Sequence, residues 1–330
     1  MKIALKLAVV ALLLLAFLFV IPSAAFLGFA EDSGEIIEIP LDTAELRRMK
    51  DPFAVPAPLE SGYISDTEYE DPSISVSITT GRWINTDYMV ARIKIVNATQ
   101  IRSAFGGSYS NPEQYFGERF VEKTNAVLAI NGDFFAKRNP GLMIRQGKTF
   151  SMPKSDRNLS YNGSIQYDIL LIDDRGDLHI MKECRMDDLR AFEGTVINTF
   201  TFGPGLVIDG VKQENFPNTN NGVTNKTQRM AIAQVGPLEY LCVCCEGPDD
   251  PGSEGLIMDE FADLVASLGV INAYNLDGGT SSTMLFRGTK VNCPKRRVRR
   301  ELVDILYFAS AYVPSPAPEE TGSPVSTDTP

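Results

Sequence analysis

The sequence is poor in the residues on which many hydrolases and metal sites depend. It has 330 residues and a single histidine, His179. A Ser-His-Asp triad and a histidine-rich metal site would therefore lack most of their usual groups. His179 lies in an alternating segment, where we expect an outward-facing polar residue of a strand. The sequence also contains no P-loop and no dinucleotide-binding glycine fingerprint.

Cysteine is also scarce, and its placement excludes a disulfide framework. The chain has five cysteines, an odd number, and three of them lie within one apolar segment, at Cys242, Cys244 and Cys245. Cys242 and Cys244 would share one face of a strand, where a bridge is geometrically poor. We expect the cysteines, including Cys184 and Cys293, to be small buried hydrophobic residues. With one histidine to join them, a zinc site is not expected.

Positive charge is in short supply as well. The net charge is −11, and removing residues 1–30, which carry two lysines and no acidic residue, would make it −13. Such an acidic chain argues against nucleic-acid binding. Residues 1–30 combine Lys2 and Lys6 with a long apolar run, which predicts an export signal or, if uncleaved, a membrane anchor. Either alternative places the remainder of the protein outside the cytoplasm.

The rest of the chain divides by composition into three parts. Residues 31–72 are acidic and contain several prolines, which predicts a linker with one short helix over residues 43–50. Residues 73–312 carry the apolar patterns of a folded domain. Residues 313–330 are rich in Pro, Ser, Thr and Glu, which predicts a disordered tail.

Strand patterns dominate the domain. Alternating or short apolar runs predict strands at residues 74–78, 89–95, 126–130, 168–173, 178–181, 206–209, 230–235, 240–245, 270–274, 284–286 and 303–309. Helices are predicted at residues 112–124 and 256–268, the second from an apolar stripe that ends before Gly269. Many strands without regularly alternating helices favour a single α+β catalytic domain with mixed or antiparallel sheets and few helices.

Two polar segments follow predicted strands and are candidates for one functional site. The first is Asn131-Gly132-Asp133-Phe134-Phe135, and the second runs from Asn275 to Thr283 with the sequence Asn-Leu-Asp-Gly-Gly-Thr-Ser-Ser-Thr. Asn-Gly and Asp-Gly are also ordinary turn sequences. The second segment, however, continues into four consecutive hydroxyl residues, which no hairpin needs. We therefore predict a site at these two strand ends.

The residue types that remain suit a sugar and a phosphate. Asp133 and Asp277 could act as nucleophile, base or stabiliser of an oxocarbenium ion. Arg229 opens an apolar strand, and a guanidinium is a natural phosphate partner, although a solvated strand end is the alternative. Backbone N–H groups and hydroxyls could form an anion nest. The expected substrate-binding residues are Asn131, Gly132, Asn275, Gly278, Gly279, Thr280, Ser281 and Ser282.

The order of several motifs resembles the phosphodiester glycosidase family. The similar motifs are Asn131 to Phe135, Gly141 to Ile144 with Gly147, Phe202 to Pro204, Arg229 to Ile232, and Asn275 to Thr283. The resemblance covers about residues 75–310 and implies hydrolysis of a sugar-1-phosphodiester at the glycosidic bond. We hypothesise that the catalytic residues are Asp133 and Asp277, acting at the anomeric carbon, and Arg229, which holds the phosphate together with the nest at residues 278–282. Many bacterial relatives are associated with exopolysaccharide metabolism.

Two departures from the family pattern concern the substrate. Glu246-Gly247-Pro248 stands where relatives tend to have an acidic residue, glycine and arginine, so one basic contact is missing. The run Lys295 to Arg300 is unusually basic. We expect it to be a solvated loop, with contact to an anionic polymer as the alternative.

Three functional hypotheses follow from the sequence. The first is an extracytoplasmic glycosidase that releases a sugar and a phosphomonoester from cell-envelope or exopolysaccharide glycans. The second is a non-catalytic module that binds a glycan or sugar phosphate during envelope or exopolysaccharide assembly. The third is metal-assisted hydrolysis, because aspartate, asparagine and hydroxyl oxygens suit Ca²⁺ or Mg²⁺.

Overall fold

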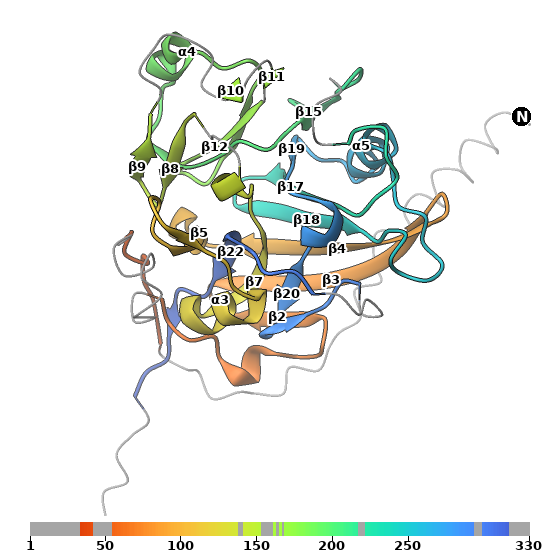
Figure 1. Ribbon diagram of the computed structural model, residues 1–330. Coiled ribbons are helices and arrows are strands. Elements are labelled where there is room, and N and C mark those ends of the chain that lie inside the picture. The colour runs from red at the N-terminus through yellow and green to blue at the C-terminus, as the bar shows by residue number, and fades with distance from the viewer. Residues whose placement is uncertain are drawn as a thin grey trace, which may run out of the picture. The chain divides into compact units, whose positions relative to one another are not determined.

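The computed structural model describes residues 34–41, 55–137, 141–152, 161–162, 165–166, 168–216, 222–293 and 299–316. One compact unit extends from Glu35 to Val313, and every strand pair described within it is antiparallel. This confirms the predicted α+β class with antiparallel sheets and few helices (Figure 1).

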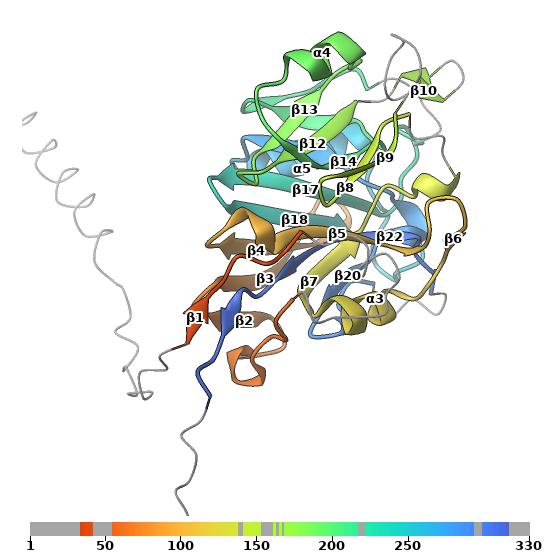
Figure 2. The ribbon, with the colours of Figure 1, turned by 90° about the vertical axis from the view of Figure 1, so that its left-hand side faces the viewer.

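Two large sheets form the centre of this domain (Figure 2). The eight-stranded sheet has, in spatial order, β16 (Val211–Lys212), β15 (Gly205–Ile208), β19 (Asn272–Asn275), β17 (Arg229–Gly236), β18 (Glu239–Cys245), β4 (Thr86–Ile95), β3 (Ile74–Trp83) and β2 (Glu68–Asp71). The six-stranded sheet has β21 (Thr289–Lys290), β20 (Met284–Phe286), β7 (Ala126–Asn131), β22 (Asp304–Ala309), β5 (Ile101–Gly107) and β6 (Pro112–Glu113).

Smaller elements surround these sheets. A three-stranded sheet joins β13 (Leu178–Met181), β12 (Ile169–Asp173) and β14 (Val196–Phe200). The two-stranded pairs are β8 (Met143–Arg145) with β9 (Lys148–Ser151), β10 (Tyr161–Asn162) with β11 (Ile165–Gln166), and β1 (Glu35–Ile36) with β23 (Tyr312–Val313). The described α-helices are α3 (Gly117–Thr124), α4 (Met186–Ala191) and α5 (Met258–Ser267), and the 3₁₀ turns are η1 (Glu60–Gly62), η2 (Ala98–Gln100), η3 (Phe135–Lys137) and η4 (Gly279–Ser281).

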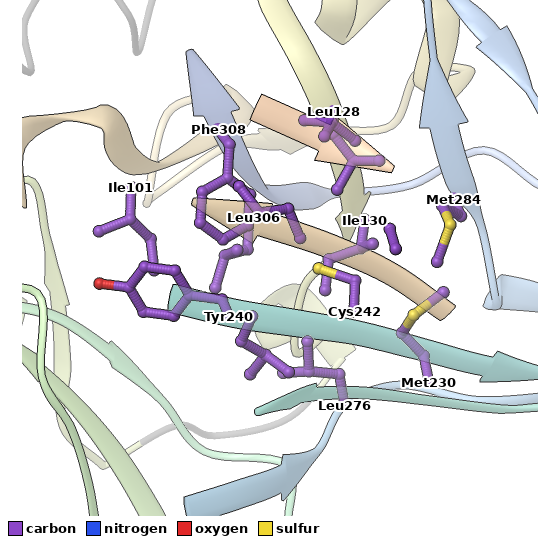
Figure 3. Close-up of a cluster of buried hydrophobic side chains, with 14 of the residues drawn as sticks. Ile101, Leu128, Ile130, Met230, Tyr240, Cys242, Leu276, Met284, Leu306 and Phe308 are labelled. Carbon is purple, nitrogen blue, oxygen red and sulfur yellow. The ribbon is translucent and has the colours of Figure 1, made fainter. Parts of the chain in front are cut away.

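The main core lies between the two large sheets. Strand alternation directs every second side chain inward, so that β3, β4, β17 and β18 contribute residues from one sheet and β7, β20 and β22 from the other. Figure 3 shows part of this core, with Met230 and Cys242 from the first sheet and Ile130 and Leu306 from the second. The helix α5 covers the opposite face of the eight-stranded sheet, and α3 packs with residues of the six-stranded sheet.

The described residues confirm the interpretation of cysteine and histidine. All five cysteines are buried and unbridged. Cys242 and Cys244 face the inter-sheet core, and Cys245 faces the side covered by α5. Nε2 of His179 lies 3.1 Å from the carboxylate of Asp173, and its imidazole packs on the ring of Phe192. This histidine is thus a strand residue in a polar surface cluster.

The start of the domain differs from the predicted boundary at residue 73. Residues 35–36 pair with β23, β2 pairs with β3, and Ile39 and Val55 are buried among apolar residues of the six-stranded sheet. The few apolar side chains between acidic residues and prolines are enough to anchor the described parts of this segment. The predicted helix 112–124 is also shorter, because a β6 strand precedes α3, whereas α5 matches its prediction.

Three of the predicted features lie outside the described residues. These are the export signal or anchor at residues 1–30, the short helix at residues 43–50, and residues 317–330 of the tail predicted at residues 313–330. Among the residues that are described, no helix has both the length and the apolar character needed to cross a bilayer.

Candidate active site

The two polar segments meet, as the sequence predicted. Asn131 ends β7 and donates from Nδ2 to the Asp277 carbonyl oxygen at 2.7 Å, while its Oδ1 accepts the Thr283 N–H at 3.0 Å. The Asp277 N–H donates to the Gly132 carbonyl oxygen at 3.2 Å. Pairing of β7 with β20 brings the loops together, because the second loop leads directly into β20.

A third segment completes this arrangement, because Asp304 opens β22 beside β7 (Figure 2). Its carboxylate accepts the N–H groups of Asp133 at 3.2 Å and Phe134 at 3.1 Å. A Cβ on Gly132 would lie 2.1 Å from Oδ2 of Asp304. Glycine is therefore needed at position 132 because the Asp304 carboxylate occupies the space of a side chain.

The carboxylate of Asp133 points into the protein. Oδ1 accepts a hydrogen bond from Nη2 of Arg145 at 3.0 Å, and Oδ2 accepts the Thr201 N–H at 2.9 Å. Asp133 is 2% exposed. This differs from the direct role at the anomeric carbon expected from the sequence, since burial and these donors hold the carboxylate away from solvent.

Arg145 joins the two buried carboxylates. Its Nη2 also donates to Oδ2 of Asp304 at 3.2 Å, and the guanidinium stacks 4.3 Å from the centroid of the Phe200 ring. Nη1 donates to the Thr199 carbonyl oxygen. Asp133, Arg145 and Asp304 thus form a buried cluster in which two carboxylates share one guanidinium.

Burial and the neighbouring Asp133 carboxylate raise the pKa of Asp304 to about 8, and Arg145 opposes this shift only in part. A pKa above 7 favours the protonated, uncharged form of Asp304 at neutral pH. A buried carboxyl group beside a second carboxylate behaves in this way because two unscreened negative charges repel strongly.

Phe134 adopts a strained backbone conformation next to this cluster. Its φ is 58°, in the left-handed region that a bulky residue rarely occupies. The hydrogen bond from its N–H to Asp304 supports this conformation. The strain turns the chain sharply after Asp133 and places Phe134 at the edge of a crevice.

This crevice lies where the three segments meet. It is small, with a volume of about 10 Å³, and is lined by Asn131, Gly132, Phe134, Asp277, Ser281, Glu301, Leu302, Val303 and Asp304. Asp277 is half-buried and Glu301 is exposed, so both residues reach solvent. The lining thus brings three carboxyl residues from two separate segments, Asp277 from one and Glu301 and Asp304 from the other, beside the first loop.

Arg229 does not direct its guanidinium into this crevice. Nε donates to the Leu256 carbonyl oxygen at 3.1 Å, and Nη2 donates to the carbonyl oxygens of Gly222 and Asn225, both at 2.8 Å. Arg229 is 2% exposed, and burial lowers its pKa to about 10. The predicted contact of Arg229 with a phosphate is therefore wrong. The side chain instead joins β17 to the segments before and after it. The backbone of β17 lies beside the second loop.

The N–H groups of the expected anion nest also donate hydrogen bonds within the protein. The N–H groups of Gly279, Ser281 and Ser282 donate to the carbonyl oxygens of Gln228, Gly278 and Gly279. The N–H of Thr283 donates to the Asn131 side chain. These donors stabilise the loop itself, because the short η4 turn folds them back onto protein oxygens. The segment therefore shapes the crevice but does not present this set of N–H groups to an anion.

The remaining predicted residues support the second loop. Asn275 donates from Nδ2 to the Gly203 carbonyl oxygen at 2.8 Å, and its N–H donates to that of Pro204 at 3.0 Å. A Cβ on Gly278 would approach the Gln228 carbonyl oxygen to 2.8 Å. Thr280 accepts a hydrogen bond from Nη1 of Arg300 at 3.2 Å. Ser282 is fully buried.

Sequence reasoning missed Arg145, Glu301 and Asp304. Arg145 directly follows a motif that resembles the family, and Asp304 interrupts an otherwise apolar run from residue 302 to 309. A buried charge in a central strand generally needs a partner. That rule identifies Asp304 as unusual, although it does not identify its partners. Within the described residues, no three acidic, histidine or cysteine side chains cluster as a metal site would require.

The fold and the crevice define a class of protein: an antiparallel two-sheet domain that presents carboxylates where strand-end loops meet. Residues 124–309 match the phosphodiester glycosidase family, and the chain belongs to that family. This membership supports a glycosidase-type hydrolytic function. The family therefore confirms the resemblance that the sequence motifs indicated.

Solved structures and curated proteins add more distant relatives. The catalytic domain of zebrafish N-acetylglucosamine-1-phosphodiester alpha-N-acetylglucosaminidase, auto-inhibited by its pro-peptide, is similar in fold with a TM-score of 0.58. It is 16% identical, and the match covers 86% of this chain and 100% of that one. A hypothetical protein from Synechocystis has a TM-score of 0.49 and 15% identity over 73% of this chain and 62% of its own.

The SPbeta prophage-derived uncharacterized protein YomE of Bacillus subtilis strain 168 is 26% identical over 212 residues. The match covers 61% of this chain and 32% of that protein, so this chain spans about a third of the relative's length.

Proposed function

We propose that this protein hydrolyses the glycosidic bond of a sugar-1-phosphodiester outside the cytoplasm. Water adds to the anomeric carbon, the bond from that carbon to the phosphate oxygen breaks, and a free sugar and a phosphomonoester are released. The observation that carries the proposal is the crevice in which Asn131, Asp277 and Asp304 converge from three segments. The family supports the reaction class, and the apolar run within residues 1–30 supports the location.

We assign the chemical step to Asp277. Its side chain lines the crevice and is half-buried, whereas that of Asp133 is enclosed. A departing phosphomonoester carries its own negative charge well and needs less protonation than a sugar hydroxyl. One accessible carboxylate, acting as base toward water or as nucleophile, is then enough. Asp133, Arg145 and Asp304 hold the first loop in position, and Arg229 supports the second.

The test is release of free sugar from a panel of UDP-sugars and sugar-1-phosphodiesters, measured with wild type, Asp277→Asn and the control Asp209→Asn. Asp209 is exposed on the turn after β15. We expect Asp277→Asn to lose at least about 100-fold in kcat, and the control to match wild type. A folded wild type that binds these compounds without turnover would instead indicate a binding module. A parallel assay with a chelator reports on Ca²⁺ or Mg²⁺ dependence.

A further inference from the structure

Arg300 connects the two motif loops beside the crevice. Its Nη1 donates to Oγ1 of Thr280 in the second loop at 3.2 Å. Its guanidinium carbon lies 5.3 Å from the centroid of the Phe134 ring in the first loop. The side chain is exposed, and the next residue, Glu301, lines the crevice. A positive charge therefore stands beside the crevice, in contact with both loops that shape it.

The groups that the sequence predicted to bind a phosphate make hydrogen bonds within the protein instead. Arg229 donates to three backbone carbonyl oxygens, and Arg145 is buried between Asp133 and Asp304. N–H groups of the second loop are used within the protein. An anion that enters beside the carboxylates of Asp277 and Glu301 would meet repulsion unless a cation compensates it.

We propose that Arg300 binds the phosphate of the substrate and makes this crevice selective for sugars with an anionic aglycone. This inference rests on the proposed function and names the residue that recognises the leaving group. A guanidinium has five N–H donors, of which Thr280 takes one, so a fork of donors remains for two phosphate oxygens. Phe134 and Thr280 orient that fork by stacking and by a hydrogen bond. The same charge stabilises the phosphomonoester as the bond to the anomeric carbon breaks.

Arg300→Gln tests this role, and Arg299→Gln is its matched control. Arg299 is the neighbouring exposed arginine, but it contacts Glu118 and stacks on Phe116. Both variants remove one positive charge from the same segment. We expect Arg300→Gln to lower kcat/KM for the phosphodiester substrate about 10- to 100-fold. Its effect on a neutral p-nitrophenyl glycoside of the same sugar should be less than about 2-fold, and Arg299→Gln should leave both substrates unaffected.

Arg300→Lys and a binding measurement distinguish recognition from a structural effect. Lysine keeps the charge but lacks the planar fork, so this variant should recover only part of the lost kcat/KM. Calorimetric titration with glucose 1-phosphate and N-acetylglucosamine 1-phosphate tests Arg300 without turnover: the better ligand for wild type should bind Arg300→Gln about 10-fold more weakly.

The possible failures are separable. If wild type binds the sugar phosphates through Arg300 but hydrolyses no substrate, the proposed hydrolysis is wrong and the role of Arg300 in binding phosphate stands. Four results would overturn the role of Arg300. Two concern kcat/KM: equal losses for the charged and neutral substrates, or equal losses in Arg300→Gln and Arg299→Gln. The other two are unchanged kinetics in Arg300→Gln and no binding of either sugar phosphate by wild type.

Discussion

The two aspartate loops follow similar local plans but place their carboxylates in opposite environments. Asp133 and Asp277 each come two residues after an asparagine at a strand end. Asp133 turns inward, where Arg145 and a backbone N–H hold it, whereas Asp277 lines the crevice. The first loop therefore acts as the rigid support, and the second presents the accessible acid. The comparison teaches that similar motifs can divide support and chemistry between them.

The largest effect on stability is expected from Arg145→Met. This variant leaves the buried carboxylates of Asp133 and Asp304 without their shared cation, which should lower the free energy of unfolding by about 3–5 kcal/mol. Chemical denaturation measures the loss. Arg299→Met, at an exposed site, is the control and should change stability by less than about 0.5 kcal/mol.

A double variant tests whether the loss of stability comes from the uncompensated carboxylate charge. Adding Asp133→Asn to Arg145→Met removes a buried carboxylate that has lost its cation and should restore part of the lost stability. Equal stabilities of Arg145→Met and the exposed control would show that the first loop does not depend on this cluster.

A smaller loss is expected from Gly132→Ala. The new methyl group would overlap the Asp304 carboxylate, so the loop or β22 must shift, at a cost of about 1–3 kcal/mol. Gly236→Ala is the matched control, because a Cβ at that position has no heavy atom within 4 Å. Thermal and chemical unfolding of both variants would compare them. A Gly132→Ala protein as stable as the control would contradict the close approach of Asp304.

Much of this architecture could be predicted from local pattern. The alternation in β3 and β4 and the apolar stripe of α5 identified these elements, because side-chain period reports directly on burial. The meeting of the two aspartate loops was also predicted, from their positions at strand ends. In these cases the information lies within a few consecutive residues.

The direction of individual side chains could not be predicted in the same way. Whether Arg229 faces a substrate or backbone carbonyl oxygens depends on Gly222 and Leu256, which no spacing rule links to it. Asp133 likewise turns inward because of Arg145 and Asp304, which are distant in the sequence from one another. Long-range partners decide the role of a charged residue, and a motif records only one side of that interaction.

The pH dependence of stability gives the smallest change per pH unit, because the contribution of Asp304 is spread over several pH units. The pKa of Asp304 is raised from an ordinary value near 3.8 to about 8, so between these values the folded protein binds more protons than the unfolded chain. This contribution is present in full below about pH 4 and is lost as pH rises toward 8. The unfolding free energy of wild type should fall relative to that of Asp304→Asn across this window, by less than about 1.4 kcal/mol per pH unit.

Denaturation curves at several pH values measure this difference, and Asp209→Asn serves as the control that should follow wild type. Asparagine at position 304 fixes the neutral charge but replaces an acceptor oxygen by a donor. It should therefore lower stability at low pH, where Asp304 of wild type is protonated, and remove the contribution of Asp304 to the slope. A constant difference between wild type and Asp304→Asn from pH 4 to 8 would mean that Asp304 stays ionised beside Asp133. The buried cluster behind the first loop would then hold Asp304 in its charged form.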